Sequence, residues 1–270
     1  MKLLLDCGNT RLKWAIAAEI TNSADLAGRA ASVASTPIVQ RGFVDYTPAA
    51  MAAWAASMCA TSLSAPLTAL LFSSVVSAER EQEIFEHLQP LRLSAQRFTV
   101  GARAGTLVNA YASPDSLGVD RWAAAIGAWG LLRHSCLIIA AGTATTIDLI
   151  EATSEGGAYR GGLILPGIEM MLQSLHQRAA RLPQANGRYR AMPDIADNTH
   201  DAMISGVIDA TIGAIERMGR RLPDDAPWLL TGGNASLLQA ILGQRVQVVD
   251  DLVLEGLAAV SAQTHHPEPV

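Results

Sequence analysis

The residues with the clearest chemical potential lie at the start of the chain, where an apolar run meets a turn and two charged side chains. Leu3–Leu5 lead into Asp6, and Lys13 follows as the chain leaves the turn. Gly8 and Asn9 tolerate positive φ, which predicts a reversal where successive backbone N–H groups point at one anion. The pattern favours a phosphate turn with a magnesium carboxylate at Asp6. The alternative is a plain hairpin with an exposed aspartate.

A second set of chemical groups lies where a glycine-rich loop becomes a helix. The loop at 101–118 carries Tyr111 and leads into Asp120 and Arg121, after which apolar residues follow at helical spacing from Trp122. A carboxylate at this place can orient an alcohol and accept its proton. The alternative for Asp120 is a helix N-terminal carboxylate that the helix dipole stabilises.

The pattern of apolar strand, glycine turn and second strand returns at 136–150. When Gly8 is set against Gly142, the two segments align as hairpins of the same kind. This repetition predicts an α/β chain of two related halves, a first domain at 1–133 and a second at 134–270. Small ligands commonly bind in clefts between domains, so we expect a nucleotide cleft there.

Apolar periodicity predicts the elements that position these groups. Between the first hairpin and the first helix, residues 19–36 are expected to form a loop. A glycine turn is expected at 161–162, before a short strand, and another at 232–233, after a strand. Strands are expected at 67–76, 98–100, 228–230 and 246–249, and helices at 48–58, 79–88, 119–132, 168–178, 199–222 and 252–262.

Composition and the absence of several known motifs exclude some classes of function. The 270 residues are 50% hydrophobic and 17% charged, with a net charge of −5, which argues against broad binding of nucleic acid or anionic membranes. No apolar run is long enough to span a bilayer. The chain has no Walker P-loop, since neither of its two lysines follows a glycine loop, and no G-x-G-x-x-G. Three widely spaced cysteines predict a reducing, cytoplasmic environment; they are Cys7, Cys59 and Cys136.

Five motifs, in order and spacing, resemble those of the type III pantothenate kinases. They are Asp6–Thr10, Gly118–Arg121, Gly142–Thr146, Gly161–Gly167 and Thr231–Gly233. That family belongs to the acetate and sugar kinase, Hsc70 and actin superfamily, so the resemblance implies two ribonuclease-H-like (actin-like ATPase) domains. It also implies ATP-dependent phosphorylation of pantothenate to 4'-phosphopantothenate, the first step of coenzyme A biosynthesis, by a cytoplasmic homodimer that uses Mg²⁺. No nucleic-acid or membrane partner is expected.

The resemblance also assigns roles to residues. Asp120 would be the catalytic base and Asp6 the metal ligand, and Arg121 could pair with the pantothenate carboxylate in a two-point contact. The adenosine end of the nucleotide would lie near 231–233. The ATP-binding positions would be Asp6, Cys7, Gly8, Asn9, Thr10, Arg11, Leu12, Lys13 and Thr143. The pantothenate-binding positions would be Tyr111, Gly118, Val119, Asp120, Arg121 and Thr199.

One position departs from the family pattern. Type III pantothenate kinases often carry an aspartate two residues before the second turn's glycine, where it binds K⁺ or NH₄⁺. This chain has Ala140 there. Alanine cannot coordinate a cation, so either the monovalent-cation requirement is relaxed or another group supplies the charge.

Two other functions remain open from the sequence. The first is a non-catalytic relative that acts as a regulatory or accessory protein, a role that loss of Asp6 or Asp120 would have favoured. The second is a superfamily kinase or phosphatase that acts on another small alcohol or on polyphosphate.

Overall fold

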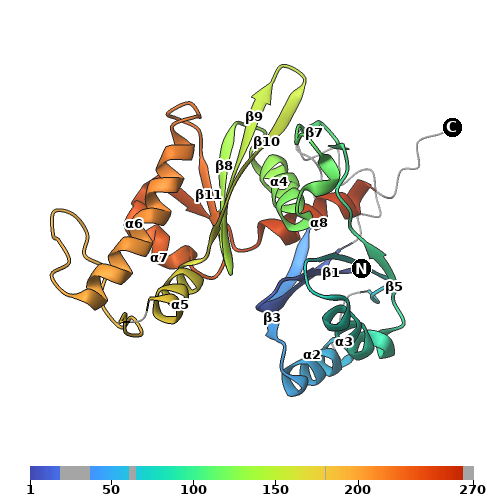
Figure 1. Ribbon diagram of the computed structural model, residues 1–270. Coiled ribbons are helices and arrows are strands. Elements are labelled where there is room, and N and C mark those ends of the chain that lie inside the picture. Colours follow the sequence, from blue (N-terminus) through green and yellow to red (C-terminus); the bar gives the residue numbers. More distant parts are fainter. Residues whose placement is uncertain (19–36, 61–64, 180, 264–270) are drawn as a thin grey trace. The chain divides into compact units, whose positions relative to one another are not determined.

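The structure is a computed structural model that describes residues 1–18, 37–60, 65–179 and 181–263. The predicted loop at 19–36 lies outside the described residues. The chain divides into two compact units, and Figure 1 labels many of their elements. The first unit contains residues 1–133, 153–158 and the C-terminal segment from Asp251, and the second contains 134–152 and 159–250. The division into domains at 1–133 and 134–270 remains a prediction from the sequence.

The first unit is built on a five-stranded mixed sheet in the order β3-β2-β1-β4-β5. Its strands are β1 (Lys2–Cys7), β2 (Arg11–Ala17), β3 (Ile38–Asp45), β4 (Ala69–Ser74) and β5 (Ser94–Arg97). The central strand β1 is antiparallel to β2 and parallel to β4. It is buried along its whole length, as its apolar composition requires.

Helices cover this sheet, and a short hairpin lies in the loop before the third of them. The helices are α2 (Pro48–Ala60), α3 (Ala78–Leu88), α4 (Val119–Leu132) and α8 (Leu252–Gln263), with 3₁₀ turns η1 (Gln89–Leu91) and η2 (Pro114–Ser116). The hairpin consists of β6 (Arg103–Ala104) and β7 (Leu107–Asn109). The segment predicted as a glycine-rich loop therefore contains two strands, which are too short to show a period.

Alternation along β1 sorts its side chains onto two faces. Leu3, Leu5 and Cys7 enter a core with residues of α2 and α3, among them Trp54 and Ile84. The intervening positions point to the opposite face, which α8 and α4 cover. On that face the Lys2 ammonium donates to the carbonyl oxygen of Ser261 in α8 at 2.8 Å. Asp6 follows on the same face, so it opens towards the ends of α4 and α8.

The helices α4 and α8 cross in direct backbone contact. A Cβ added to Gly127 of α4 would lie 2.3 Å from the carbonyl oxygen of Leu252, and one added to Gly256 of α8 would lie 1.9 Å from that of Ala123. Only glycine permits so close an approach. The crossing fixes α4, which carries Asp120, against α8, which begins just after Asp251.

The second unit repeats the strand order of the first. Its strands are β8 (Cys136–Ala141), β9 (Ala144–Thr153), β10 (Gly156–Pro166), β11 (Trp228–Thr231) and β12 (Val246–Val248). They are the first five strands of a seven-stranded sheet in the order β12-β11-β8-β9-β10-β7-β6. Like β1, the central β8 is antiparallel to the next strand and parallel to β11. The first residues of β10 are grouped with the first unit, where Gly157 N–H donates to the Thr106 carbonyl at 3.0 Å.

Helices α5 (Ile168–Arg178), α6 (Thr199–Gly219) and α7 (Ala235–Leu242), with the 3₁₀ turn η3 (Gly243–Arg245), complete the second unit. Their apolar faces pack with β8, β9 and β11 in one core that includes Ile139, Ile215 and Leu230. The repeated topology confirms the predicted fold class, an α/β chain with two related mixed sheets.

Two further element predictions were wrong. The strand predicted at 98–100 lies at 94–97 instead, because β5 is a polar, exposed edge strand that pairs with β4 and shows no apolar pattern. The glycine turn predicted at 161–162 is part of the strand β10. There Gly162 is needed for packing, since its Cβ would lie 1.9 Å from the carbonyl oxygen of Ile147.

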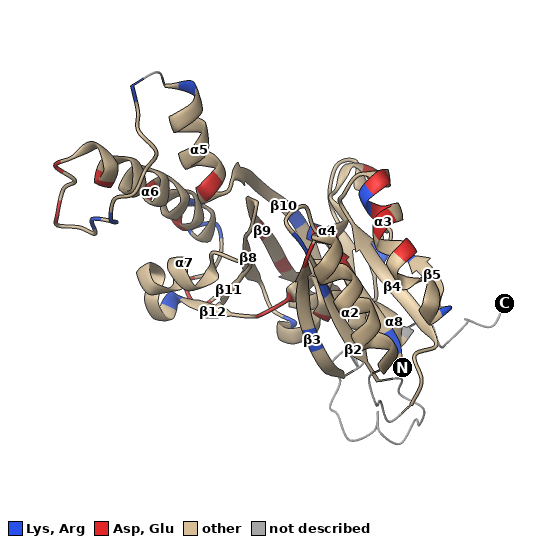
Figure 2. Cartoon of the chain, turned by 90° about the horizontal axis from the view of Figure 1, so that it is seen from below, with Lys and Arg blue, Asp and Glu red and all other residues tan. Residues whose placement is uncertain are grey.

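Acidic and basic side chains are mixed on single elements. Figure 2 shows both signs on α3, where Arg80 lies among glutamates and pairs with Glu83 at 3.0 Å. None of the helices in the described part of the chain is both long enough and apolar enough to cross a membrane.

Candidate active site

The charged residues of the first hairpin meet at the end of β1. Asp6 and Lys13 are paired in the antiparallel register of β1 and β2, so their side chains lie on the same face of the sheet. Asp6 is 8% exposed. The Lys13 ammonium, which is about a quarter exposed, forms an ion pair with Asp251 Oδ1 at 2.6 Å. The hairpin is therefore tied to the loop before α8.

The turn itself differs from its sequence-based interpretation. Neither Gly8 nor Asn9 has positive φ. The Gly8 N–H donates to the Asp6 carbonyl at 3.2 Å, so this donor is engaged within the turn and does not face outward. The Tyr46 hydroxyl donates to the Gly8 carbonyl at 2.8 Å and fastens the turn to the end of β3. Asn9 and Thr10 are exposed, so they form the accessible part of the turn.

Three other predicted ATP-binding residues have side chains that are buried or stacked on another residue. Cys7 and Leu12 are completely buried, and burial raises the pKa of the Cys7 thiol. Both residues can offer only backbone groups. The Arg11 guanidinium stacks on the Phe43 ring, with its carbon 4.5 Å from the ring centroid.

The predicted pantothenate residues of the first unit gather at the start of α4. Gly118 precedes the helix, and a Cβ there would lie 2.7 Å from Asp120 Oδ1, so this position cannot carry a side chain without displacing the carboxylate. Val119 begins the helix, and Asp120 Oδ1 accepts the Arg121 N–H at 2.9 Å. Arg121 is buried, with its guanidinium carbon 5.8 Å from the centroid of the Tyr111 ring.

The loop that carries Tyr111 is held by a buried asparagine. Asn109 donates through Nδ2 to the Gly101 carbonyl at 3.2 Å and accepts the Tyr111 N–H through Oδ1 at 3.1 Å. The Asn109 side chain thus spans the loop and fixes the backbone at Tyr111.

Electrostatics link Asp6 to the N-terminal ends of the covering helices α4 and α8. Burial raises the pKa of Asp6 to about 7; Lys13 opposes this shift, while the negative charges of Asp251 and Asp120 add to it. The charges of Lys13, Asp120 and Asp251 thus act on Asp6 within the first unit.

Sequence reasoning missed Asp251. It lies 238 positions from Lys13 along the chain, and two aspartates just before a helix are also typical of simple helix starts. Only the fold brings Asp251 to the first hairpin.

The second unit brings three glycine motifs together around the Gly142–Thr143 turn. Gly167 N–H donates to the Thr143 carbonyl at 2.9 Å, and a Cβ on Gly167 would lie 2.4 Å from the carbonyl oxygens of both turn residues. Gly232, with φ of +102°, has no room for a Cβ beside the Ala141 carbonyl. Thr143 is exposed at the tip of this turn.

The predicted Thr199 begins α6, also in the second unit, and is exposed. The segment at 186–190 is fastened along the start of this helix. Asp201 accepts the Arg188 N–H at 2.8 Å and the Arg190 Nε–H at 2.6 Å. These bonds lower the pKa of Asp201 to about 2, the Arg188 N–H contributing most. The two units therefore hold separate parts of the predicted site.

The residues around Asp6 fit a hard cation such as Mg²⁺. No group of three or more acidic, histidine or cysteine side chains in the described part of the chain could hold a metal by itself. Mg²⁺ commonly takes one or two carboxylates and completes its shell with phosphate oxygens and water. Ser73 lies beside Asp6 in the register of β4, and its buried hydroxyl has no hydrogen-bond partner among the described residues. It is available to a metal-bound water.

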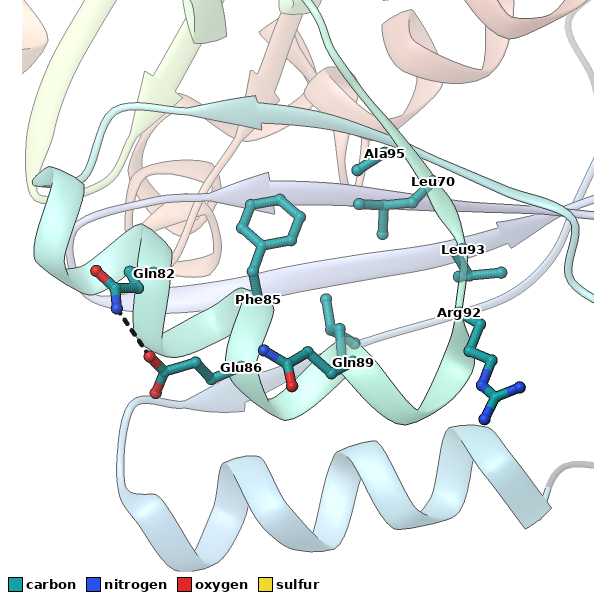
Figure 3. Close-up of a pocket in the computed structure, with 9 residues that line it drawn as sticks. Leu70, Gln82, Phe85, Glu86, Gln89, Arg92, Leu93 and Ala95 are labelled. Atoms are coloured by element: carbon teal, nitrogen blue, oxygen red, sulfur yellow. Dashed lines mark hydrogen bonds between the residues drawn. The ribbon is translucent and has the colours of Figure 1, made fainter.

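A separate surface pocket of about 430 Å³ lies between α3 with η1 and the strands β4 and β5 (Figure 3). Leu70, Phe85 and Leu93 supply apolar lining, while Gln82 donates to Glu86 at 2.9 Å on its rim. None of the predicted site residues lines this pocket.

Two mixed sheets that have five strands in the same order, each begun by a hairpin with a glycine turn, give an α/β fold of two related halves. Solved structures share this fold. One is a protein from Campylobacter jejuni described as a conserved Baf family transcriptional activator (TM-score 0.60, 17% identity, covering 98% of this chain and 100% of that chain). Another is the ethanolamine utilization protein EutJ from Carboxydothermus hydrogenoformans (TM-score 0.51, 12% identity, 97% and 89%).

The sequence profile of type III pantothenate kinases matches residues 2–221. The type III pantothenate kinase of Aromatoleum aromaticum is 38% identical, with 97% of this chain and 98% of that protein covered. That of Cupriavidus taiwanensis is also 38% identical, with coverage of 96% and 97%. The chain belongs to the type III pantothenate kinase family. This confirms the predicted family and its function as a type III pantothenate kinase.

Proposed function

We propose that the protein transfers the γ-phosphoryl group of ATP to the 4'-hydroxyl of pantothenate, with Asp120 as the catalytic base. The observation that carries the proposal is the joint placement of Asp6, Lys13 and Asp120 in one unit, close enough for the charges of Lys13 and Asp120 to shift the pKa of Asp6. This placement supports a role for Asp120 as the base for the acceptor, with Asp6 and Lys13 serving metal and phosphate.

The acceptor is a primary alcohol, which is a poor nucleophile until its proton is removed. Asp120 orients the hydroxyl and takes its proton as the new O–P bond forms, while the bond from the γ-phosphorus to the bridging oxygen breaks and leaves ADP. Asp120 is half-buried at the helix start, and one oxygen already accepts the Arg121 N–H. That bond holds the carboxylate in place and leaves the other oxygen for the substrate.

Arg121 and Tyr111 are suited to the other end of pantothenate. The Arg121 guanidinium is buried and lies against the Tyr111 ring, which restricts its orientation. A planar guanidinium fixed in this way binds a carboxylate with two parallel hydrogen bonds. Pantothenate carries a carboxylate, so this pair selects it over neutral sugars.

On the nucleotide side, Lys13 and the accessible Asn9–Thr10 backbone of the first unit would hold phosphate oxygens, and Thr143 in the second unit stays a predicted ATP-binding residue. Asp6 would hold Mg²⁺, with Ser73 bonded to one of its waters. When bound, Mg²⁺ neutralises charge that develops on the transferred phosphoryl group. We propose no monovalent-cation site at Ala140, because a methyl side chain cannot coordinate one. A homodimer and a cytoplasmic location remain predictions from the family.

The test is ADP release from MgATP with pantothenate, glucose or polyphosphate as the only acceptor. The proposal predicts turnover with pantothenate alone. It also predicts that Asp120→Asn lowers kcat by about 10²- to 10⁴-fold, since the general base is lost. Equal turnover on glucose, or an Asp120→Asn variant with full activity, would contradict the assignment.

A further inference from the structure

Lys13 forms its ion pair with Asp251, although Asp6 is its partner across the sheet register. Lys13 lies directly across the β1–β2 register from Asp6 and lowers its pKa, so its charge is close to the carboxylate. The ammonium nevertheless forms its ion pair with Asp251, at 2.6 Å. Without another carboxylate, a lysine in this register would be expected to pair with Asp6 itself.

We propose that Asp251 is a positioning residue that holds the Lys13 ammonium away from Asp6 and so keeps the Asp6 carboxylate open to Mg²⁺. This proposal rests on the proposed function, because it assumes that Asp6 serves the metal of MgATP. Asp251 lies just before α8 and is 14% exposed, so its carboxylate is held in a protected place. The Asp251 carbonyl accepts the Glu255 N–H at 3.0 Å, which anchors its backbone to the first turn of the helix.

The neighbouring Asp250 does not share this arrangement. It is exposed, and it is its carbonyl oxygen, not its carboxylate, that accepts the Thr231 hydroxyl at 3.2 Å. The compact units also divide between these two residues, with Asp250 in the second and Asp251 in the first. Asp250 therefore provides a control of the same charge at the adjacent position.

The experiment measures how much Mg²⁺ strengthens nucleotide binding. Isothermal titration of ADP, with and without Mg²⁺, gives the ratio of the two dissociation constants. In Asp251→Asn, Lys13 is free to pair with Asp6 and compete with the metal, so the ratio should fall about tenfold. Binding of ADP without Mg²⁺ should be unchanged or tighter, because a negative charge near the phosphates has been removed. Asp250→Asn should keep the wild-type ratio.

A double-mutant cycle tests whether Asp251 acts through Lys13. Once Lys13→Ala has removed the competitor, adding Asp251→Asn should change the ratio by less than about twofold. The same tenfold fall in the Lys13→Ala background, or an unchanged ratio in Asp251→Asn alone, would overturn the proposal. Asparagine keeps the side-chain shape and the backbone cap of α8, so the variant should fold, and circular dichroism checks this. Wild-type protein that binds MgADP with a normal ratio but does not phosphorylate pantothenate would contradict the proposed function instead.

Discussion

We predict that alanine substitution at two glycines of α4 has different effects on stability, because only one of them lies at the crossing with α8. A Cβ on Gly127 would lie 2.3 Å from the Leu252 carbonyl oxygen and 2.9 Å from the Gly256 nitrogen. A Cβ on Gly130 would meet nothing within 4 Å. Both contacts of Gly127 are with backbone atoms, so no side-chain rotation can relieve them.

The change in the free energy of unfolding combines a gain in helix propensity with a cost of overpacking. Replacing glycine by alanine within a helix gains up to about 1 kcal/mol from helix propensity, and this gain applies to both positions. At Gly127 the helices must also separate by about 1 Å to restore ordinary contact, and such overpacking costs about 1–3 kcal/mol. Gly130→Ala should therefore stabilise the first unit slightly, and Gly127→Ala should be about 1–3 kcal/mol less stable than Gly130→Ala.

Urea unfolding of the two variants, followed by tryptophan fluorescence and circular dichroism, measures this difference. Because α4 carries Asp120 and α8 follows Asp251, Gly127→Ala should also lower kcat, while Gly130→Ala should not. A Gly127→Ala protein as stable and as active as Gly130→Ala would refute the close helix contact and the positioning argument based on it.

Further predictions concern the second unit. The pKa of Asp201 is lowered to about 2, chiefly by the Arg188 N–H, so its bonds stabilise the fold above the ordinary aspartate pKa and are lost as pH falls towards 2. Asp201→Asn should thus lower Tm at pH 7, and the gap to wild type should narrow below about pH 4 in a pH series of melting curves. Tyr159→Phe removes a 2.8 Å hydrogen bond to the buried Asp148 carboxylate and should cost about 1.5–3 kcal/mol in urea unfolding. Replacing K⁺ by Na⁺ should leave pantothenate kinase activity unchanged, because Ala140 offers no ligand; strong K⁺ stimulation would point to another cation site.

Much of the fold could be predicted because its signals are local. The helix predicted at 168–178 matches α5, and the apolar run of β1 and the repeated hairpin at 136–150 are also seen. The edge strand β5 could not be found, since its polar residues follow no period and only pairing with β4 makes them a strand. Gly162 was misjudged for a similar reason, as sequence cannot distinguish a glycine needed for a turn from one needed for close packing.

The site was predictable only in part. Sequence placed Asp6 and Asp120 at strand and helix ends, and the fold brings both into one electrostatic group. The engagement of the Gly8 N–H within its own turn depends on backbone geometry that residue types do not fix. Asp251 was hidden because its partner Lys13 lies at the other end of the chain.

The central claim is that Asp120 drives transfer of a phosphoryl group to pantothenate. Its most direct test is mass spectrometry with NMR of pantothenate after incubation with MgATP and either wild-type protein or Asp120→Asn at equal concentration. The account predicts one added phosphoryl group on the 4'-hydroxyl with wild type and almost none with the variant, which should still bind MgADP. Equal product from both proteins, or no phosphorylated pantothenate from wild type, would contradict it.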